Sequence, residues 1–345
     1  MRAAIFALTL AAAATLAGCG GGVSVPAQNS GGTPVPPAQQ IAYTAIGASD
    51  AVGFGATMPC ANPPLVAQPT CPGGTGYVPL IANTLTKSGA TVTLNDLGIS
   101  GAVLGPDILA VGNMYGTASG ASPCKPRTGG DAIPGDFITN ELPNVPATAT
   151  LVTVFAGGND TNAIANAAIC MTLGGATQQQ VASFVTAQVS AFGADLQKLL
   201  LGVQSKTQGK AKIVIADVPN FANIPYAAGG IPGIGPLPPA VRALLQQISV
   251  TGFDQNVYQT AATQFKVPTV DLLCDPNSYV VSNFYVNDGF HPNDAGYAAL
   301  AQKFVAQITA TTPTQPSFTC AQTAINPSAS ATLRKLEALP NFNIR

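Results

Sequence analysis

The chain has 345 residues, only 8% of them charged, and its formal net charge is −1 at neutral pH. Its 14 Lys and Arg residues are scattered, so the sequence excludes the basic surface that a nucleic-acid backbone requires. With 36 Gly and 29 Pro, it predicts many ordered loops around the core of one large domain.

The first residues predict an exported protein. Arg2 precedes an apolar run at residues 3–14 that is too short to span a bilayer. The sequence Leu-Ala-Gly-Cys at residues 16–19 resembles a bacterial lipobox, in which the cysteine is lipidated once the signal peptide is removed. We therefore expect residues 1–18 to be a lipoprotein signal peptide. Cys19 would then anchor the protein in the membrane of a bacterial cell envelope, and we expect the outer membrane.

Composition divides the remaining chain into three parts. Residues 19–40 are rich in Gly, Ser, Pro, Gln and Asn and have few large apolar side chains, which predicts a flexible tether. Residues 41–322 carry the apolar runs of a single folded domain. Residues 323–345 form a C-terminal tail for which the sequence indicates no role.

Five short apolar or β-branched runs in this domain predict buried strands. Helical patterns lie between them, and the clearest places Val181, Val185 and Val189 on one apolar stripe. This alternation predicts an α/β fold, a three-layer αβα sandwich around a mainly parallel five-stranded sheet. The expected strands are residues 41–46, 90–94, 150–155, 211–216 and 267–272, and the expected helices are residues 76–87, 178–201, 239–265 and 293–309.

Six cysteines remain besides Cys19. An exported chain meets an oxidising compartment, so their even number predicts disulfides rather than metal ligands. No C-x-x-C pair occurs, and one histidine cannot build a His-rich metal site, so we expect no metal. Several connectivities are open, and our working hypothesis pairs the cysteines in chain order: Cys60 with Cys71, Cys124 with Cys170, and Cys274 with Cys320.

The candidate site lies in the segments that follow the strands, because ligands bind beyond the carboxyl ends of parallel strands. Gly-Ala-Ser-Asp at residues 47–50 follows the first strand, Gly-Ile-Ser-Gly at 98–101 the second, and Gly-Gly-Asn-Asp at 157–160 the third. Asp-Gly-Phe-His at 288–291 carries the only histidine of the chain. Each segment alone also has an ordinary structural explanation, such as a helix cap, a turn or a hydrogen-bonded loop histidine.

In this order, the four segments resemble the four sequence blocks of the SGNH, or GDSL-type, hydrolase superfamily. The likeness spans residues 41–309, and its first block departs from the literal Gly-Asp-Ser-Leu because Ala48 replaces the acidic residue before the serine. The resemblance implies a flavodoxin-like fold, a serine esterase or lipase activity and no cofactor. It implies Ser49 as nucleophile with Asp288 and His291, and an oxyanion hole formed by Ser49, Gly101 and Asn159.

The chemistry of these residue types is coherent. A serine hydroxyl needs a neighbouring base to take its proton, and histidine does this near neutral pH. Asp288 would orient His291 and stabilise its imidazolium form. The backbone N–H groups of Ser49 and Gly101 and the side-chain amide of Asn159 would stabilise the negative charge on the carbonyl oxygen.

Other activities receive less support. Residues around Ser49 lack the Gly-x-Ser-x-Gly elbow of α/β-hydrolases, and no P-loop or GxGxxG follows the first strand. Two-carboxylate glycosidase chemistry is harder to exclude, because any acidic pair could serve, but nothing in the sequence points to one. An acyltransferase that uses the same acyl-enzyme remains an alternative, as does a non-catalytic ligand-binding lipoprotein of the envelope.

The substrate is expected to be a small-molecule, lipid or glycan ester. Two long Gly/Pro-rich insertions, residues 102–146 and 221–238, should wall the cleft, and their apolar side chains either bind an acyl chain or pack on the sheet. Esters of short or medium chain length are the first hypothesis, and acetylated glycans and phospholipids stay open. The apolar side chains concerned are Leu104, Ile108, Leu109, Met114, Phe221, Ile231 and Ile234.

Overall fold

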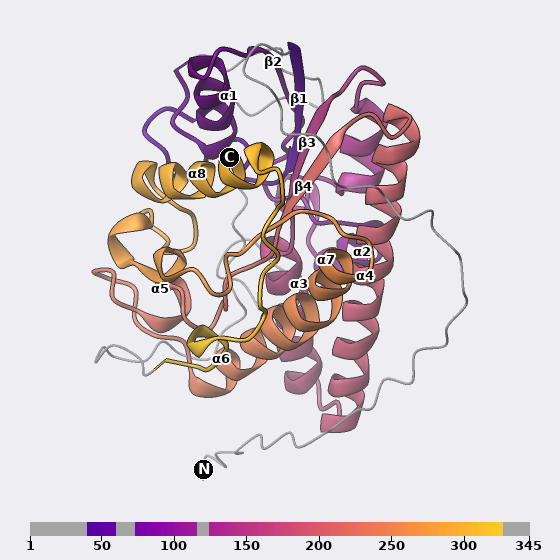
Figure 1. Cartoon of the computed structure of the whole chain (residues 1–345). Coiled ribbons are helices and arrows are strands. Elements are labelled where there is room, and N and C mark those ends of the chain that lie inside the picture. Colours follow the sequence, from indigo (N-terminus) through magenta and orange to yellow (C-terminus); the bar gives the residue numbers. More distant parts are fainter. Residues whose placement is uncertain (1–39, 60–72, 116–123, 327–345) are drawn as a thin grey trace.

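A single parallel sheet organises the molecule. The computed structural model describes residues 40–59, 73–115 and 124–326 (Figure 1). All neighbouring strands run in the same direction, in the order β2-β1-β3-β4-β5. The predicted five-stranded α/β architecture is therefore confirmed. The strands are β1 (Gln40–Gly47), β2 (Thr91–Asp96), β3 (Leu151–Phe155), β4 (Lys212–Ala216) and β5 (Thr269–Val270).

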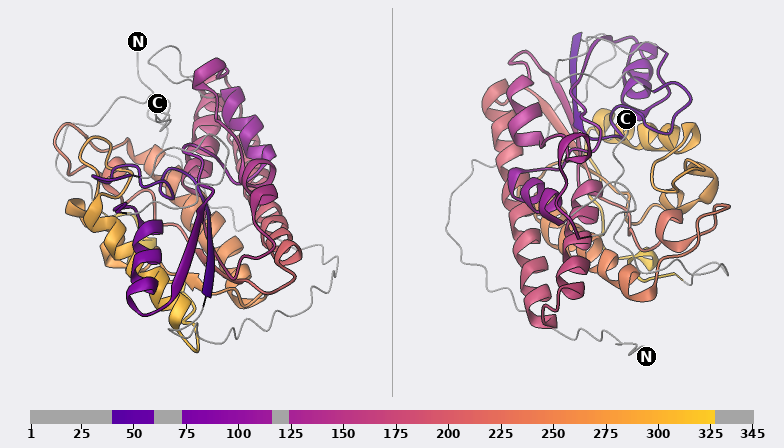
Figure 2. Two further views of the ribbon diagram at one scale, coloured as in Figure 1. Left: turned by 90° about the horizontal axis from the view of Figure 1, so that it is seen from above. Right: turned by 180° about the vertical axis from the view of Figure 1, so that it is seen from behind.

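Helices cover both faces of the sheet (Figures 1 and 2). Helices α1 (Tyr77–Lys87) and α8 (Asp294–Thr309) lie on one face, where Tyr77 stacks on Phe304 with ring centroids 5.2 Å apart. Helices α2 (Pro106–Tyr115), α3 (Gly158–Leu173) and α4 (Gln178–Thr207) lie on the other face, above the larger of two apolar cores. Every layer of the predicted sandwich is thus present.

Helix α3 was not expected from the sequence. Every residue from Asp160 to Cys170 is buried, because α3 lies between the sheet and the neighbouring helices. A helix that is buried all round shows no apolar stripe in its sequence. Helix α2 was also unexpected, since it forms inside the insertion of residues 102–146 that we had interpreted as a cleft wall.

Other elements differ from the prediction in extent. Helix α4 runs six residues further than expected, and its N-terminus is closed by a capping box between Thr177 and Gln180. The expected helix at residues 239–265 is divided, with a π-helical stretch in its middle. The remaining elements are η1 (Gly129–Asp131), η2 (Phe137–Glu141), η3 (Leu142–Asn144), α5 (Pro225–Ala228), α6 (Pro239–Gln246), η4 (Gln247–Tyr258), α7 (Gln259–Thr263), η5 (Pro276–Tyr279), η6 (Val281–Asn283) and η7 (Ala321–Thr323).

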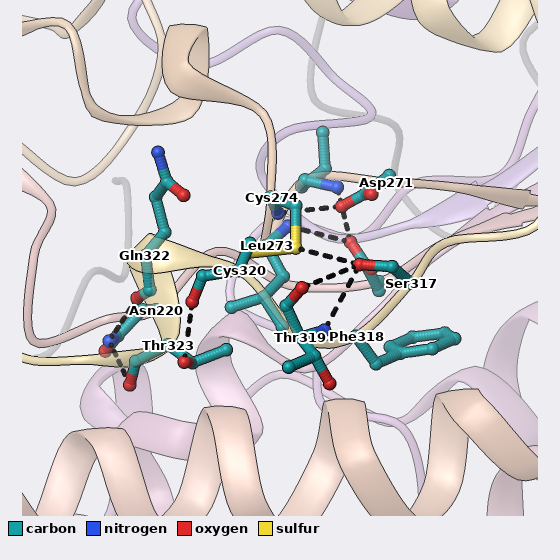
Figure 3. The surroundings of a disulfide bond; sticks show 12 residues. Asn220, Asp271, Leu273, Cys274, Ser317, Phe318, Thr319, Cys320, Gln322 and Thr323 are labelled. Carbon is teal, nitrogen blue, oxygen red and sulfur yellow. Dashed lines mark hydrogen bonds between the residues drawn. A yellow bond between two sulfur atoms is a disulfide. The ribbon is translucent and has the colours of Figure 1, made fainter.

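Two of the three expected disulfides are formed, Cys124–Cys170 and Cys274–Cys320. The second disulfide joins the segment after β5 to residues 320–326, which we call the C-terminal strip (Figure 3). Next to it, the Asn220 side-chain amide donates to the Gln322 carbonyl at 2.8 Å. The third expected pair, Cys60 and Cys71, and the lipidation candidate Cys19 lie outside the described residues.

No helix within residues 40–59, 73–115 and 124–326 combines the length and the apolar character that crossing a membrane demands.

Candidate active site

The turn after β1 and the loop before α8 meet at the carboxyl edge of the sheet. The Ser49 hydroxyl lies 2.8 Å from His291 Nε2, although 242 positions separate the two residues in the sequence. Both side chains are fully buried. The fold therefore places a hydroxyl within hydrogen-bond reach of the only imidazole in the chain, which is the geometry that proton transfer requires.

Asp288 holds His291 from the opposite side. One Asp288 carboxylate oxygen lies 2.7 Å from His291 Nδ1, and the other accepts the backbone N–H groups of Phe290 and His291. Gly289 lies between them with a φ of +66°, and a Cβ there would approach the Tyr226 backbone nitrogen to 2.9 Å. The turn thus needs glycine at this position.

Two phenyl rings enclose the imidazole. The Phe54 ring lies edge-on to His291 with centroids 4.6 Å apart, and the Phe290 ring does so at 5.0 Å. Such edge-to-face contacts restrict rotation of the imidazole and shield it from water. Phe290 belongs to the fourth sequence block, whereas Phe54 carries no motif signal and was missed in the sequence.

The segments after β2 and β3 are joined to each other. The Asn159 side-chain amide donates to the Ala102 carbonyl at 2.8 Å, next to Gly101. The Asp160 carboxylate accepts the Leu104 N–H at 2.8 Å and the Gly157 N–H at 3.2 Å. Asp160 is the last residue of the Gly-Gly-Asn-Asp block, and the sequence analysis assigned it no role.

Backbone donors remain free at this edge. Counting only acceptors in the described parts of the chain, the N–H groups of Ser49 and Gly101 form no hydrogen bond with protein atoms. Gly101 adopts a φ of +84°, so a side chain at this position would strain the backbone. Backbone N–H groups without a protein acceptor are of the kind that can bind an oxyanion.

Burial changes the proton affinity of nearby carboxyl groups. It raises the pKa of Asp160 to about 7, while the bonds from the Leu104 and Gly157 N–H groups lower it. Burial likewise raises the pKa of Asp96, the last residue of β2, to about 7 against the bond from Gly98. The pKa of Asp50 is raised by burial and lowered by the neighbouring His291. Carboxyl groups with a raised pKa therefore lie in the segments at the ends of β1, β2 and β3.

A small apolar cavity of about 80 Å³ adjoins the candidate site. Its lining includes Asp50, Gly158 and Phe290, the sequence neighbours of Ser49, Asn159 and His291, and it includes Phe221 from the second insertion. Phe221 and Phe290 stack with centroids 5.4 Å apart. A short apolar group would fit such a space.

The expected apolar wall is only partly present. Leu104 and Ile108 are fully buried in the larger core. These two side chains therefore pack in the core and do not line an open cleft. Met114 is 57% exposed near the end of α2. Ile231 is buried in the same core, and Leu109 and Ile234 are partly buried against it.

Within the described ranges, no group of three or more His, Cys, Asp and Glu side chains is arranged to hold a metal ion.

Comparisons with known proteins show a family for this chain. The sequence model of the GDSL-like lipase/acylhydrolase family matches residues 45–299. Solved structures of similar fold include an extracellular lipase from Streptomyces rimosus, at 16% identity and a TM-score of 0.47, with 78% of this chain and 100% of that one covered. A phospholipase A1 from Streptomyces albidoflavus is 16% identical with a TM-score of 0.46, covering 79% and 100%. No curated protein matches the chain.

Proposed function

This chain belongs to the GDSL-like lipase/acylhydrolase family and is a carboxylic ester hydrolase, and we propose that it works through an acyl-enzyme on Ser49. In this proposal His291 is the general base and Asp288 orients it. The oxyanion hole consists of the N–H groups of Ser49 and Gly101 and the Asn159 amide.

Acylation would begin with transfer of the Ser49 proton to His291 Nε2. The freed oxygen attacks the ester carbonyl carbon, and the carbonyl oxygen becomes an oxyanion that the three donors stabilise. When the intermediate collapses, the carbon–oxygen bond to the alcohol breaks and His291 returns the proton to the leaving alcohol. A water molecule then repeats the sequence on the acyl-enzyme and releases the acid.

The observation that carries this proposal is the 2.8 Å contact between Ser49 and His291. A bond between two residues 242 positions apart, both fully buried, supports a functional pairing more than a local turn contact does. The test is hydrolysis of p-nitrophenyl esters of graded chain length by the wild type and by Ser49→Ala. We expect at least a 1000-fold loss of kcat, and undiminished turnover by a folded variant would refute the nucleophile.

A phosphonate inhibitor gives a second measurement. It should add one equivalent of mass to the wild type, on the peptide that contains Ser49, and none to Ser49→Ala. Labelling at another serine would move the nucleophile elsewhere without affecting the family assignment.

We propose short or medium-chain esters as substrates, because the adjoining apolar cavity of about 80 Å³ has room for a short acyl group. Transfer to another alcohol instead of water uses the same acyl-enzyme. Product analysis in the presence of competing glycerol or sugar acceptors separates the two reactions, since a transferase yields new esters rather than free acid.

We also propose that the protein is exported and anchored through Cys19, on the strength of the lipobox-like residues 16–19. The test is fractionation of cells that produce the wild type or Cys19→Ala. We expect the wild type in the membrane fraction and the variant outside it, and equal distribution would contradict lipid anchoring.

A further inference from the structure

The carboxyl group of Glu141 touches the turn that carries Ser49. Glu141 is the last residue of η2 and lies in the insertion between β2 and β3. Its Oε2 accepts the backbone N–H of Gly47 at 2.9 Å, across 94 positions of sequence. Gly47 ends β1 and stands two residues before Ser49. The insertion therefore reaches the start of the nucleophile turn with a charged or chargeable group.

Both polar groups of the Gly47 backbone are held at this point. The Gly47 carbonyl accepts the Ile99 N–H at 3.1 Å, which connects β1 to the loop that leads to Gly101. The Gly47 N–H donates to Glu141, as described. There is little room for adjustment, because a Cβ at Gly47 would approach the Ala51 Cβ to 2.9 Å. The direction in which the chain enters the Ser49 turn thus depends on these two bonds.

Burying the Glu141 carboxyl costs folding free energy. Glu141 is only 1% exposed, and its Oε1 has no hydrogen-bond partner among the described residues. Burial raises the pKa of Glu141 well above its usual range, and the bond from Gly47 lowers it. A buried carboxyl with an unsatisfied oxygen destabilises a fold, so its presence calls for an explanation. The backbone N–H groups that this carboxyl meets, those of Gly47 and Ile99, lie on the two chain segments that lead to Ser49 and Gly101.

The element that presents Glu141 is firmly held. Phe137 and Ile138 of η2 are buried in the larger core. The Phe137 N–H donates to the Val103 carbonyl at 3.0 Å, and the Asp136 carboxylate caps the element by accepting the Thr139 N–H at 2.7 Å. The element that carries Glu141 is therefore hydrogen-bonded to the loop after β2, at Val103, two residues after Gly101.

We propose that Glu141 is a positioning residue for the nucleophile, a role that rests on the proposed function of Ser49. Its carboxyl fixes the Gly47 N–H and so aims the Ser49 hydroxyl at His291 and its backbone N–H at the oxyanion. The first sequence block has Ala48 in place of the acidic residue before the serine, so this carboxyl is supplied by the insertion instead.

The test compares Glu141→Gln, which keeps an acceptor oxygen, with Glu141→Met, which keeps the volume and removes the acceptor. With p-nitrophenyl butyrate we expect Glu141→Gln to stay within about threefold of wild-type kcat. We expect Glu141→Met to lose roughly 10-fold to 100-fold in kcat with KM within threefold, since a misaimed group affects the transition state more than binding. The rate of phosphonate labelling of Ser49 should fall in parallel.

Asp254→Leu provides a matched control. The Asp254 carboxyl is also fully buried and accepts one backbone N–H after a strand, that of Val218 at 3.2 Å, but it lies beyond β4. We expect this variant to lower the melting temperature while kcat of the folded protein stays within threefold. An equal kcat loss in Asp254→Leu, or a folded Glu141→Met of wild-type kcat, would overturn the proposal.

Should Glu141→Met yield no soluble protein, Glu141→Gln and Glu141→Asp carry the test. The aspartate side chain is one methylene shorter, so its carboxyl lies further from the Gly47 N–H. We therefore expect a clear loss of kcat in Glu141→Asp and none in Glu141→Gln. A Gln variant as impaired as the Asp variant overturns the role of the acceptor. Failure of the Ser49 proposal is recognised separately, because Ser49→Ala would then remain active.

Discussion

The Asp160 carboxylate accepts the backbone N–H of Leu104 at 2.8 Å, and this bond ties the start of α3 to the loop that carries Gly101. Its other oxygen accepts the N–H of Gly157, which has a φ of +105°. Two donors of the proposed oxyanion hole, Gly101 and Asn159, thus belong to segments that share one buried carboxylate.

Removing this carboxylate should weaken both structure and activity. We expect Asp160→Ala to lower the free energy of unfolding by about 2–5 kcal/mol, because two buried N–H groups lose their acceptor. We expect kcat to fall roughly 10-fold or more as the oxyanion donors separate. Urea unfolding and p-nitrophenyl ester kinetics measure the two effects. Asp107→Ala, at an exposed position of α2, is the control. If Asp160→Ala changed stability and kcat as little as Asp107→Ala, the proposed role of Asp160 in joining the two segments would be contradicted.

Stability should fall as pH rises from about 4 to about 7. Burial raises the pKa of Asp96 and of Asp160 to about 7 in the folded protein, against about 3.9 for an unfolded aspartate. The folded state therefore binds these protons more tightly, so their contribution is fully present below pH 4 and is lost as pH passes through 7. The loss reaches a few kcal/mol per group, to order of magnitude. Urea unfolding at pH 4.5, 6 and 8 measures it.

Asp96→Asn separates one of these groups from the rest. Asparagine retains an oxygen that can accept the Gly98 N–H and carries no charge to bury. We expect the variant to be more stable than the wild type at pH 8 and about equal at pH 4.5, so that its stability depends less on pH. An identical pH dependence in the two proteins would show that Asp96 does not titrate in this range.

The Phe54 ring should matter for activity through His291. We expect Phe54→Ala to lower kcat roughly 10-fold with a smaller change in KM, because the imidazole loses the edge contact with the Phe54 ring. Since the chain has one histidine, NMR of its ring reports this environment without overlap. Phe184→Ala, on α4, removes a comparable ring contact with Tyr115 and serves as the control. If the imidazole signals and kcat were unchanged in Phe54→Ala, the contact with Phe54 would have no role in activity.

The sequence allowed the sheet to be predicted because buried parallel strands are short apolar runs. It overestimated β5, since residues 267–272 form a run of mainly apolar or β-branched residues, but only Thr269–Val270 pair with β4. It missed α3 because a helix buried on all sides has no stripe, and α2 because Gly and Pro dominate its surroundings. Apolar periodicity reports the contrast between a buried and an exposed helix face, and α3 lacks that contrast from Asp160 to Cys170.

The site was predictable only where its residues form short runs. Ser49, Asn159, Asp288 and His291 each stand in a recognisable block, and the structure brings the segments together at one edge. Phe54 and Glu141 could not be found in this way, because the roles proposed for them rest on contacts with residues far away in sequence. Glu141 reaches Gly47 over 94 positions, and no local pattern encodes that distance.

The Cys274–Cys320 bond should stabilise the protein without serving activity. It closes a loop of 46 residues and holds the C-terminal strip where Asn223 and Arg242 bond to the Ala324 and Asn326 carbonyls (Figure 3 shows the bond itself). We expect the double variant Cys274→Ser/Cys320→Ser to lose about 3–4 kcal/mol of stability, since the unfolded chain gains freedom. Below its melting temperature, kcat should stay within twofold of wild type, because the bond touches none of the candidate catalytic groups. Thermal unfolding with and without reductant measures the first effect, and Cys124→Ser/Cys170→Ser gives the comparison. A large kcat loss in the folded Cys274 variant would mean that the C-terminal strip supports the site as well as the fold.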